Sequence, residues 1–140
     1  DKGFGHLKDL PNLRKLVIGK AAISPTGAAA IGQCKELRYL GLVGCGITDG
    51  EFVGMKGLTM LEHLALSENP QITDKSMATV KTFERMRVLY LNKTALTDRG
   101  LAELKGLDGL RTLSVKGTKV TSDAGDKFVD EMPNLRKIGL

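Results

Sequence analysis

Residues 86–107 read MRVLYLNKTALTDRGLAELKGL and contain one full copy of a pattern that recurs along the chain. The copy opens with three apolar residues in the spacing L-x-x-L-x-L, in which the inward-facing leucines of a strand alternate with outward-facing residues. It closes with Leu101, Leu104 and Leu107, whose spacing of three gives one apolar face on a short helix. The stretch therefore predicts one short strand followed by a helical return.

The opening frame occurs six times, starting at residues 13, 37, 61, 86, 110 and 135. These starts lie 24 or 25 residues apart, and such a period is typical of a stacked repeat protein. The units are 13–36, 37–60, 61–85, 86–109 and 110–134, with a partial unit at 135–140 and the tail of a preceding unit at 1–12. Because the pattern stops inside a unit, we expect an excerpt of a longer protein.

The composition is that of a globular chain with an aliphatic core. Hydrophobic residues make up 41% of the 140 residues, charged residues 26% and aromatic residues only 4%. These fractions argue against disordered, collagen-like and membrane classes. The net charge of +5 permits a nucleic-acid binder without indicating one, because a basic total matters only when it gathers on one face.

Residues that could perform chemistry are few. The chain has two cysteines and two histidines, and no Cys–His spacing typical of a metal site. Cys34 falls at a helix core position and Cys45 at a turn, in different layers, so we expect two buried and unpaired thiols. No serine or cysteine nucleophile lies in a recognisable motif. We therefore predict no enzymatic activity, no cofactor and no metal ion.

An aspartate recurs at the predicted start of the helical returns. The members of this series are Asp49, Asp74, Asp98 and Asp123. Aspartate is a favoured N-cap, because its carboxylate accepts a hydrogen bond from an unpaired N–H of the first turn. An acidic track that holds metal ions is the alternative. Since each aspartate has the same place at a helix entry, we predict capping.

These frames resemble leucine-rich repeats over nearly the whole chain. The stretch Cys45–Asp49 is similar to the cysteine-containing, ribonuclease-inhibitor-like subtype, and Thr97–Leu107 resembles 24-residue bacterial repeats. The resemblance implies an α/β fold, a right-handed solenoid in a horseshoe arc with a concave parallel β-sheet and convex short helices. Stacking is also expected physically, because one unit alone cannot bury its apolar stripe.

The resemblance further implies a polar ladder at the ninth position of each unit, where a side chain bonds the backbone of neighbouring turns. The residues at this position are Ala21, Cys45, Asn69, Thr94 and Thr118. Their types suit this role, because unpaired backbone groups beneath a turn are costly. We predict that Cys45 is a buried thiol of this ladder.

The outward-facing strand positions form columns when the units stack. The second position, called here the arginine column, contains Arg14, Arg38, Glu62, Arg87, Arg111 and Arg136. Parallel strands lie about 4.8 Å apart, so Glu62 is expected to contact the arginines on both adjacent strands. The fifth position is mostly small and leaves a shallow floor.

Both tyrosines of the chain fall on this concave face and flank His63 in the sequence of units. Aromatic residues together with arginines are typical of protein interfaces. The predicted partner-binding residues are Tyr39, His63, Tyr90, Val43, Arg38, Glu62, Arg87 and Arg111. The predicted function is a protein–protein interaction module that binds its partner on the concave sheet.

The alternative is binding of a polyanion, either nucleic acid or an acidic glycan, through the arginine column with Lys15 and Lys137. It ranks second, because single-strand recognition usually relies on stacked aromatics and two tyrosines are few. The arginines can also be plain solvated covering of the sheet, since surface ion pairs contribute little. We expect a monomer unless the open repeat ends pair with another molecule.

Overall fold

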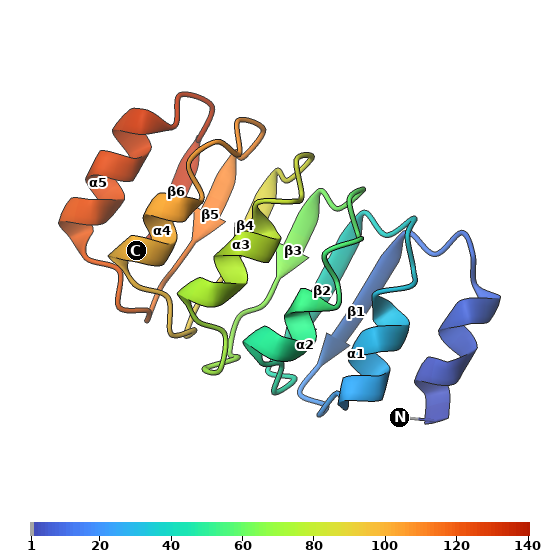
Figure 1. The fold of residues 1–140 in the computed structure, drawn as a ribbon. Helices are drawn as coiled ribbons and strands as arrows, with labels where there is room; N and C mark the ends of the chain where they lie inside the picture. Colours follow the sequence, from blue (N-terminus) through green and yellow to red (C-terminus); the bar gives the residue numbers. More distant parts are fainter. Residues whose placement is uncertain (1) are drawn as a thin grey trace.

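The computed structural model describes residues 2–140, in which each unit contributes one short strand, a turn and a helical return (Figure 1). The strands are β1 (Lys15–Gly19), β2 (Tyr39–Val43), β3 (His63–Ala65), β4 (Val88–Tyr90), β5 (Thr112–Ser114) and β6 (Lys137–Gly139). All pairings are parallel, and the sheet order β1-β2-β3-β4-β5-β6 follows the chain. The predicted solenoid with its parallel sheet is confirmed.

The helical returns lie together on one face of the sheet (Figure 1). They are α1 (Pro25–Ile31), α2 (Asp49–Val53), α3 (Met77–Val80), α4 (Asp98–Glu103) and α5 (Ser122–Glu131). Two 3₁₀ helices, η1 (Lys2–Asp9) and η2 (Asp74–Ser76), complete the helical side. The opposite face of the sheet carries no helix within residues 2–140 and is therefore the exposed strand face.

The strand register makes equivalent positions of consecutive units lateral neighbours. Tyr39 pairs with Lys15 on one side and with His63 on the other. The arginine column lies one residue before the strands and keeps the same order, because the backbone N–H of Arg38 donates to the carbonyl of Arg14 at 2.9 Å. The predicted columns are therefore real rows of neighbours in space.

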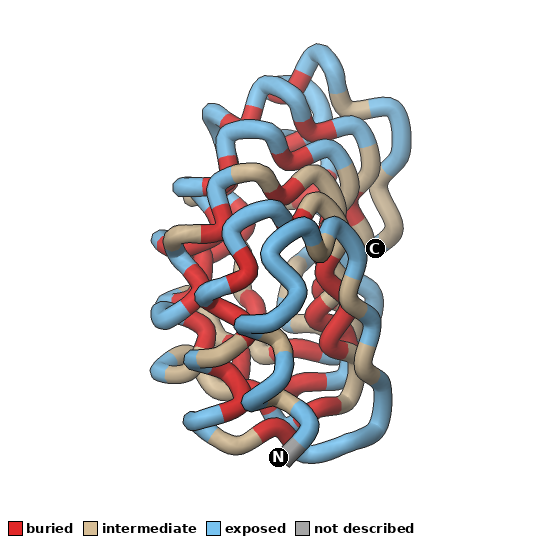
Figure 2. The backbone as a smooth tube through the Cα atoms, turned by 90° about the vertical axis from the view of Figure 1, so that its right-hand side faces the viewer, coloured by how far each residue is buried: buried red, intermediate tan, exposed pale blue. Residues whose placement is uncertain are grey.

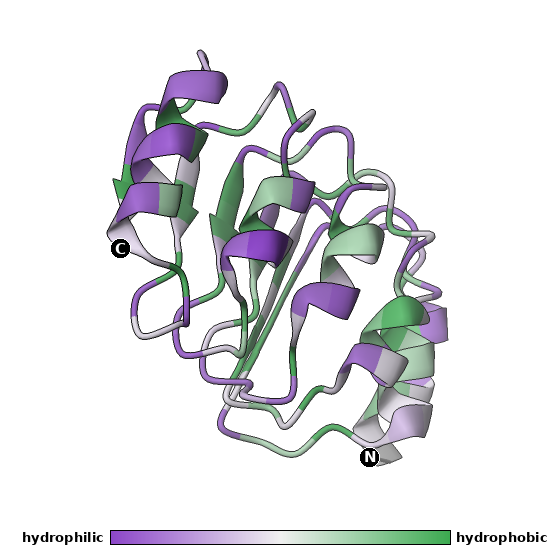
Figure 3. Cartoon of the chain, turned by 60° about the vertical axis from the view of Figure 1, so that its left-hand side comes forward, coloured by the Kyte–Doolittle hydropathy of each residue, from purple (hydrophilic) through white to green (hydrophobic). Residues whose placement is uncertain are grey.

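The core lies between sheet and helices and is mainly aliphatic. Figure 2 shows the buried residues gathered inside the coils, and Figure 3 shows hydrophobic strands facing helices of mixed character. On the helical side, Phe52 and Phe83 meet edge to face with ring centroids 6.2 Å apart. Leu64 is fully buried in the middle, whereas Leu16 and Ile138 in the outer strands are partly exposed because they have a neighbouring strand on one side only.

The helix starts correct one prediction. The N-caps are threonines, whose side-chain oxygens accept hydrogen bonds from the first turn: Thr48, Thr73, Thr97 and Thr121. Asp49, Asp74 and Asp98 are the first helical residues, and Asp123 is the second. Capping by aspartate was therefore wrong by one or two positions. Each threonine has the extended backbone that a cap requires, so it takes the role.

Candidate partner-binding face

The third position of the first three units forms an ordered stack on the concave face. The ring of Tyr39 lies against that of His63, with centroids 5.4 Å apart and planes inclined by 17°. On its other side the ammonium of Lys15 stands 5.0 Å from the Tyr39 ring centroid. Both faces of Tyr39 are therefore covered, and the residue presents its ring edge and hydroxyl to a partner.

Glu62 joins two arginines, as the sequence predicted. Its Oε1 lies 3.0 Å from Nη1 of Arg38, and its Oε2 lies 3.8 Å from Nε of Arg87. All three side chains are partly exposed, so the pairs contribute little to stability. Their effect is to fix three long side chains in place and to neutralise part of the arginine column.

Tyr90 lies apart from the other two rings. It occupies the fifth position, with Ala65 beside it on one strand and Ser114 on the other, whereas His63 pairs with Val88. The Tyr90 side chain is 38% exposed. The structure therefore divides the predicted aromatic group into a Tyr39–His63 stack and a solitary Tyr90 with small neighbours.

Val43 and Arg111 complete the predicted set. Val43 ends β2 and is half-buried beside the exposed Gly19. The next two units use this position internally, because Ser67 Oγ accepts the Asn92 N–H at 3.2 Å. Arg111 lies exposed in the arginine column. All eight predicted residues are thus on or beside the concave face, spread across four neighbouring units rather than joined in one cluster.

The ninth-position ladder is centred on Asn69, which is fully buried. Its Oδ1 accepts the backbone N–H groups of Cys45 at 3.0 Å and Ile47 at 3.2 Å. Its Nδ2 donates to the carbonyls of Leu42 at 2.7 Å and Leu66 at 2.8 Å. One amide therefore satisfies backbone groups of two units, as the resemblance implied for this position.

Other members of the ladder behave differently according to residue type. Cys45 donates from Sγ to the carbonyl of Ile18, 3.3 Å away in the preceding unit. The hydroxyls of Thr94 and Thr118 instead donate within their own units, to carbonyls at 2.7 Å and 2.6 Å. Threonine is too short to reach the neighbouring turn, so the cross-unit ladder covers only the first three units.

Both cysteines are structural thiols. Cys34 and Cys45 are free and buried. Burial raises the pKa of each thiol above its ordinary value, so the nucleophilic thiolate is disfavoured. The sequence prediction of two buried, unpaired thiols is confirmed.

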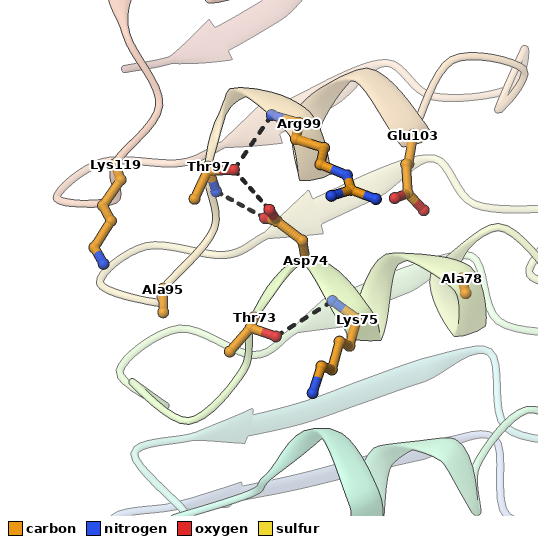
Figure 4. Close-up of a pocket in the computed structure, with 9 residues that line it drawn as sticks. All are labelled: Thr73, Asp74, Lys75, Ala78, Ala95, Thr97, Arg99, Glu103 and Lys119. Carbon is orange, nitrogen blue, oxygen red and sulfur yellow. Dashed lines mark hydrogen bonds between the residues drawn. The ribbon is translucent and has the colours of Figure 1, made fainter.

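A second ladder was missed by the sequence prediction. In this Thr–Asp ladder, each aspartate binds the capping threonine of the next unit, in the pairs Asp49–Thr73, Asp74–Thr97 and Asp98–Thr121. Asp74, for example, accepts the Thr97 N–H at 2.8 Å and its hydroxyl at 2.6 Å (Figure 4). The recurring Thr-Asp pair was the signal, but its partner lies a whole unit away.

The start of this ladder shows its physical requirement. The first unit has Pro25 where the later units have aspartate, so Thr48 has no carboxylate to bind in the preceding unit. Glu51 of the same helix takes over, and its Oε2 accepts the Thr48 N–H at 2.8 Å in a capping box. The threonine N–H is thus satisfied by a carboxylate in either case.

The largest hollow, of about 630 Å³, lies at this helix-start edge and away from the concave face (Figure 4). Asp74 in its wall is already bound to Thr97. Across residues 2–140, no three His, Cys, Asp or Glu side chains come together as a metal site. No helix in the described part of the chain is long and apolar enough to cross a membrane.

Comparison with known proteins agrees with this architecture. A family model described as "Leucine Rich repeat" matches residues 57–80. The Receptor-like protein kinase HAIKU2 of Arabidopsis thaliana is 37% identical over 67 residues, which are 48% of this chain and 7% of that kinase. This chain therefore spans a small part of the relative's length.

Solved structures show the same fold at lower identity. An internalin of Listeria monocytogenes superposes with a TM-score of 0.79 and 21% identity, covering 94% of this chain and 36% of the internalin chain. The tropomodulin C-terminal domain of Caenorhabditis elegans has a TM-score of 0.59 and 14% identity, with 99% and 80% of the two chains covered. By its recurring frame, its stacked strands and these similarities, the chain is a leucine-rich-repeat solenoid.

Proposed function

We propose that this chain is a protein-interaction module that holds its partner on the concave sheet. The supporting observation is that the Lys15–Tyr39–His63 stack and the Arg38–Glu62–Arg87 group order long side chains on that face before any partner arrives. Side chains that are already immobilised lose less entropy on binding. Leucine-rich-repeat proteins generally mediate protein–protein contacts, and this face supports that role here.

Tyr90 is the proposed anchor of the interface. Its ring projects between Ala65 and Ser114, which are small enough to leave room for a partner's side chains on both flanks. Tyrosine and arginine are the residue types most often found at binding hot spots. The Tyr39 hydroxyl and the edge of its ring would form a second contact region two strands away.

A binding role is also favoured over catalysis by the environment of the reactive groups. Both thiols are buried, and no hydrogen bond joins the His63 ring to another side chain described in the structure. A general base needs its proton donor within hydrogen-bond reach. We therefore propose that the described concave face recognises a partner without transforming it.

The subtype of the repeat is likewise proposed from the residues. The 24- or 25-residue units agree with 24-residue bacterial repeats, while the Cys45 thiol at the ninth position is the feature shared with the cysteine-containing subtype. Only one unit has cysteine at that position. The bacterial type is therefore the better description of the array.

The test is partner capture with matched surface variants. Immobilised wild-type chain is compared with a Tyr39→Ala/Tyr90→Ala variant and with a Val53→Ala/Val129→Ala variant, which removes exposed apolar side chains from α2 and α5. We expect the tyrosine variant to lose the captured protein, with an affinity loss of about 2 kcal/mol or more per hot-spot residue by calorimetry. Retention by the tyrosine variant and loss by the valine variant would place the interface on the helices.

A further inference from the structure

The arginine column is divided into two chemically different halves. Glu62 holds Arg38 and Arg87. Arg111 and Arg136, further along the same column, have no carboxylate within 4.0 Å among the residues that the structure describes. Unpaired positive charge on this face is therefore concentrated at the β5–β6 end of the column.

These unpaired arginines line a hollow of their own. A pocket of about 350 Å³ lies at the edge where β5 and β6 begin, and its walls are formed by Arg87, Arg111, Arg136, Asp108, Gly109, Pro133 and Asn134. The three arginines are on adjacent rungs, since the N–H of Arg111 donates to the Arg87 carbonyl and that of Arg136 to the Arg111 carbonyl, each at 2.9 Å. We call this hollow the arginine pocket.

The arginine pocket has an excess of positive charge and ordered walls. Its lining contains three guanidinium groups and one carboxylate, that of Asp108. The two turns that form its walls are tied together, because Asn134 Nδ2 donates to the Asp108 carbonyl at 3.0 Å. A concave site lined by one sign of charge concentrates its field on ligands of the opposite sign.

We propose that the arginine pocket binds an acidic segment of the protein partner, with a glutamate or aspartate carboxylate between Arg111 and Arg136. The planar fork of a guanidinium matches the two oxygens of a carboxylate and forms paired, charge-assisted hydrogen bonds. This proposal rests on the proposed function and names the chemistry of the partner. It places the acidic contact beside Tyr90, on the next strands of the same face.

A nucleic acid fits the same surface poorly. Both faces of Tyr39 are occupied by Lys15 and His63, so this ring offers no platform for a base. Glu62 places a negative charge in the middle of the column. A phosphate backbone crossing the sheet would meet that charge, whereas a short acidic segment at the β5–β6 end would not.

The first experiment measures binding of fluorescein-labelled hexaglutamate by anisotropy. An Arg111→Gln/Arg136→Gln variant is compared with Lys56→Gln/Lys81→Gln, which makes the same charge change at exposed positions on the helical side. We expect the arginine variant to weaken binding by about tenfold or more, because charge-assisted bonds are lost. The lysine control should stay within about twofold, since distant surface charges are screened.

The second variant predicts a gain. Glu62→Gln releases Arg87, which lines the arginine pocket, so hexaglutamate should bind more tightly than to wild type. Thermal melting of every variant confirms that it is folded. Equal weakening in the arginine and lysine variants, no weakening in either, or weaker binding by Glu62→Gln would each overturn the proposal.

Two further outcomes separate this proposal from the proposed function. Tighter binding of a short oligothymidylate than of hexaglutamate would overturn the acidic-segment proposal in favour of nucleic acid. If the Tyr39→Ala/Tyr90→Ala variant loses its captured partner while the arginine variant keeps it, only the acidic contact is wrong. If the tyrosine variant keeps the partner and hexaglutamate binding still depends on the arginines, the proposed tyrosine interface is wrong instead.

Discussion

The helix-start edge and the concave sheet face are built from the same stacked columns, yet they treat charge in opposite ways. At the helix-start edge, Asp49, Asp74 and Asp98 each bind the threonine of the next unit. On the concave face, Arg111 and Arg136 project without a carboxylate partner in the described chain. Columns whose members bind one another stabilise the stack, and columns with unmatched members are available to a partner.

The difference teaches where a solenoid can change without unfolding. Ladder residues satisfy backbone groups that are shielded from water, so their loss leaves unpaired donors and acceptors. Concave residues exchange one solvated contact for another. Substitutions in the two regions should therefore separate effects on stability from effects on binding.

The largest expected effect is that of Asn69→Leu. This change keeps the side-chain size but leaves the N–H groups of Cys45 and Ile47 and the Leu42 carbonyl without their partner. Each buried unsatisfied group costs about 1–3 kcal/mol, so we expect a loss of about 4 kcal/mol or complete unfolding. Urea denaturation followed by circular dichroism measures it.

Thr94→Val is the matched control for Asn69→Leu at the same position of the next unit. It removes one hydroxyl bond, to the Leu91 carbonyl, and should cost about 1 kcal/mol. Equal losses for the two variants would show that the amide contributes no more than a single turn bond, contrary to the ladder interpretation.

The next effect tests the Thr–Asp ladder through pH. Burial acts to raise the pKa of Asp49, but hydrogen bonds from Ser76 and Thr73 outweigh it and the pKa is lowered. A carboxyl whose pKa is lowered by folding adds stability above its unfolded pKa of about 4, and this contribution is lost as the pH falls through the folded value. Acid unfolding should therefore begin below about pH 4.

Asp49→Asn should remove that acid-dependent contribution and lower stability at pH 7 by about 2 kcal/mol, because two or more charge-assisted bonds are weakened. Asp123→Asn is the control, since Asp123 is exposed and binds no threonine among residues 2–140. Thermal melts at several pH values compare the two. Identical pH profiles for wild type and Asp49→Asn would exclude a role for this carboxylate in stability.

A smaller effect is expected in the turn after each strand. The residue there has a positive φ in every full unit: Lys20, Gly44, Glu68, Lys93 and Gly117. Gly44→Ala should cost about 1 kcal/mol from backbone strain alone, because the added methyl would meet no atom closer than 3.7 Å. Lys20→Gly should relieve the same strain and stabilise. Differential scanning calorimetry would contradict this view if both changes destabilised equally.

The period and the columns could be predicted because apolar spacing is repeated in every unit. The contact of Glu62 with Arg38 and Arg87 followed directly from that register. The positive-φ column could not be read as easily, since Gly44 and Gly117 indicate it while Lys20 and its equivalents obscure it. A non-glycine residue in this conformation has no distinct sequence signature.

Contacts that depend on side-chain direction were also beyond the sequence. The assignment of cap to Asp98 rather than Thr97 failed because one residue of shift separates the extended cap from the first helical turn. The separation of Tyr90 from the Tyr39–His63 stack depends on a two-residue offset between columns. Periodicity fixes which residues share a face, whereas pairing within that face needs rotamers and register.

The smallest effect on stability, and the sharpest contrast with Asn69→Leu, is expected for Glu62→Gln. The carboxylate reaches two partly exposed arginines, and pairs of this kind contribute about 0–1 kcal/mol. Urea denaturation should therefore place the variant within about 0.5 kcal/mol of wild type. A loss comparable to that of Asn69→Leu would show that Glu62 is part of the structural framework. The concave face would then share the role of the ladders, and the division between the two regions would fail at its centre.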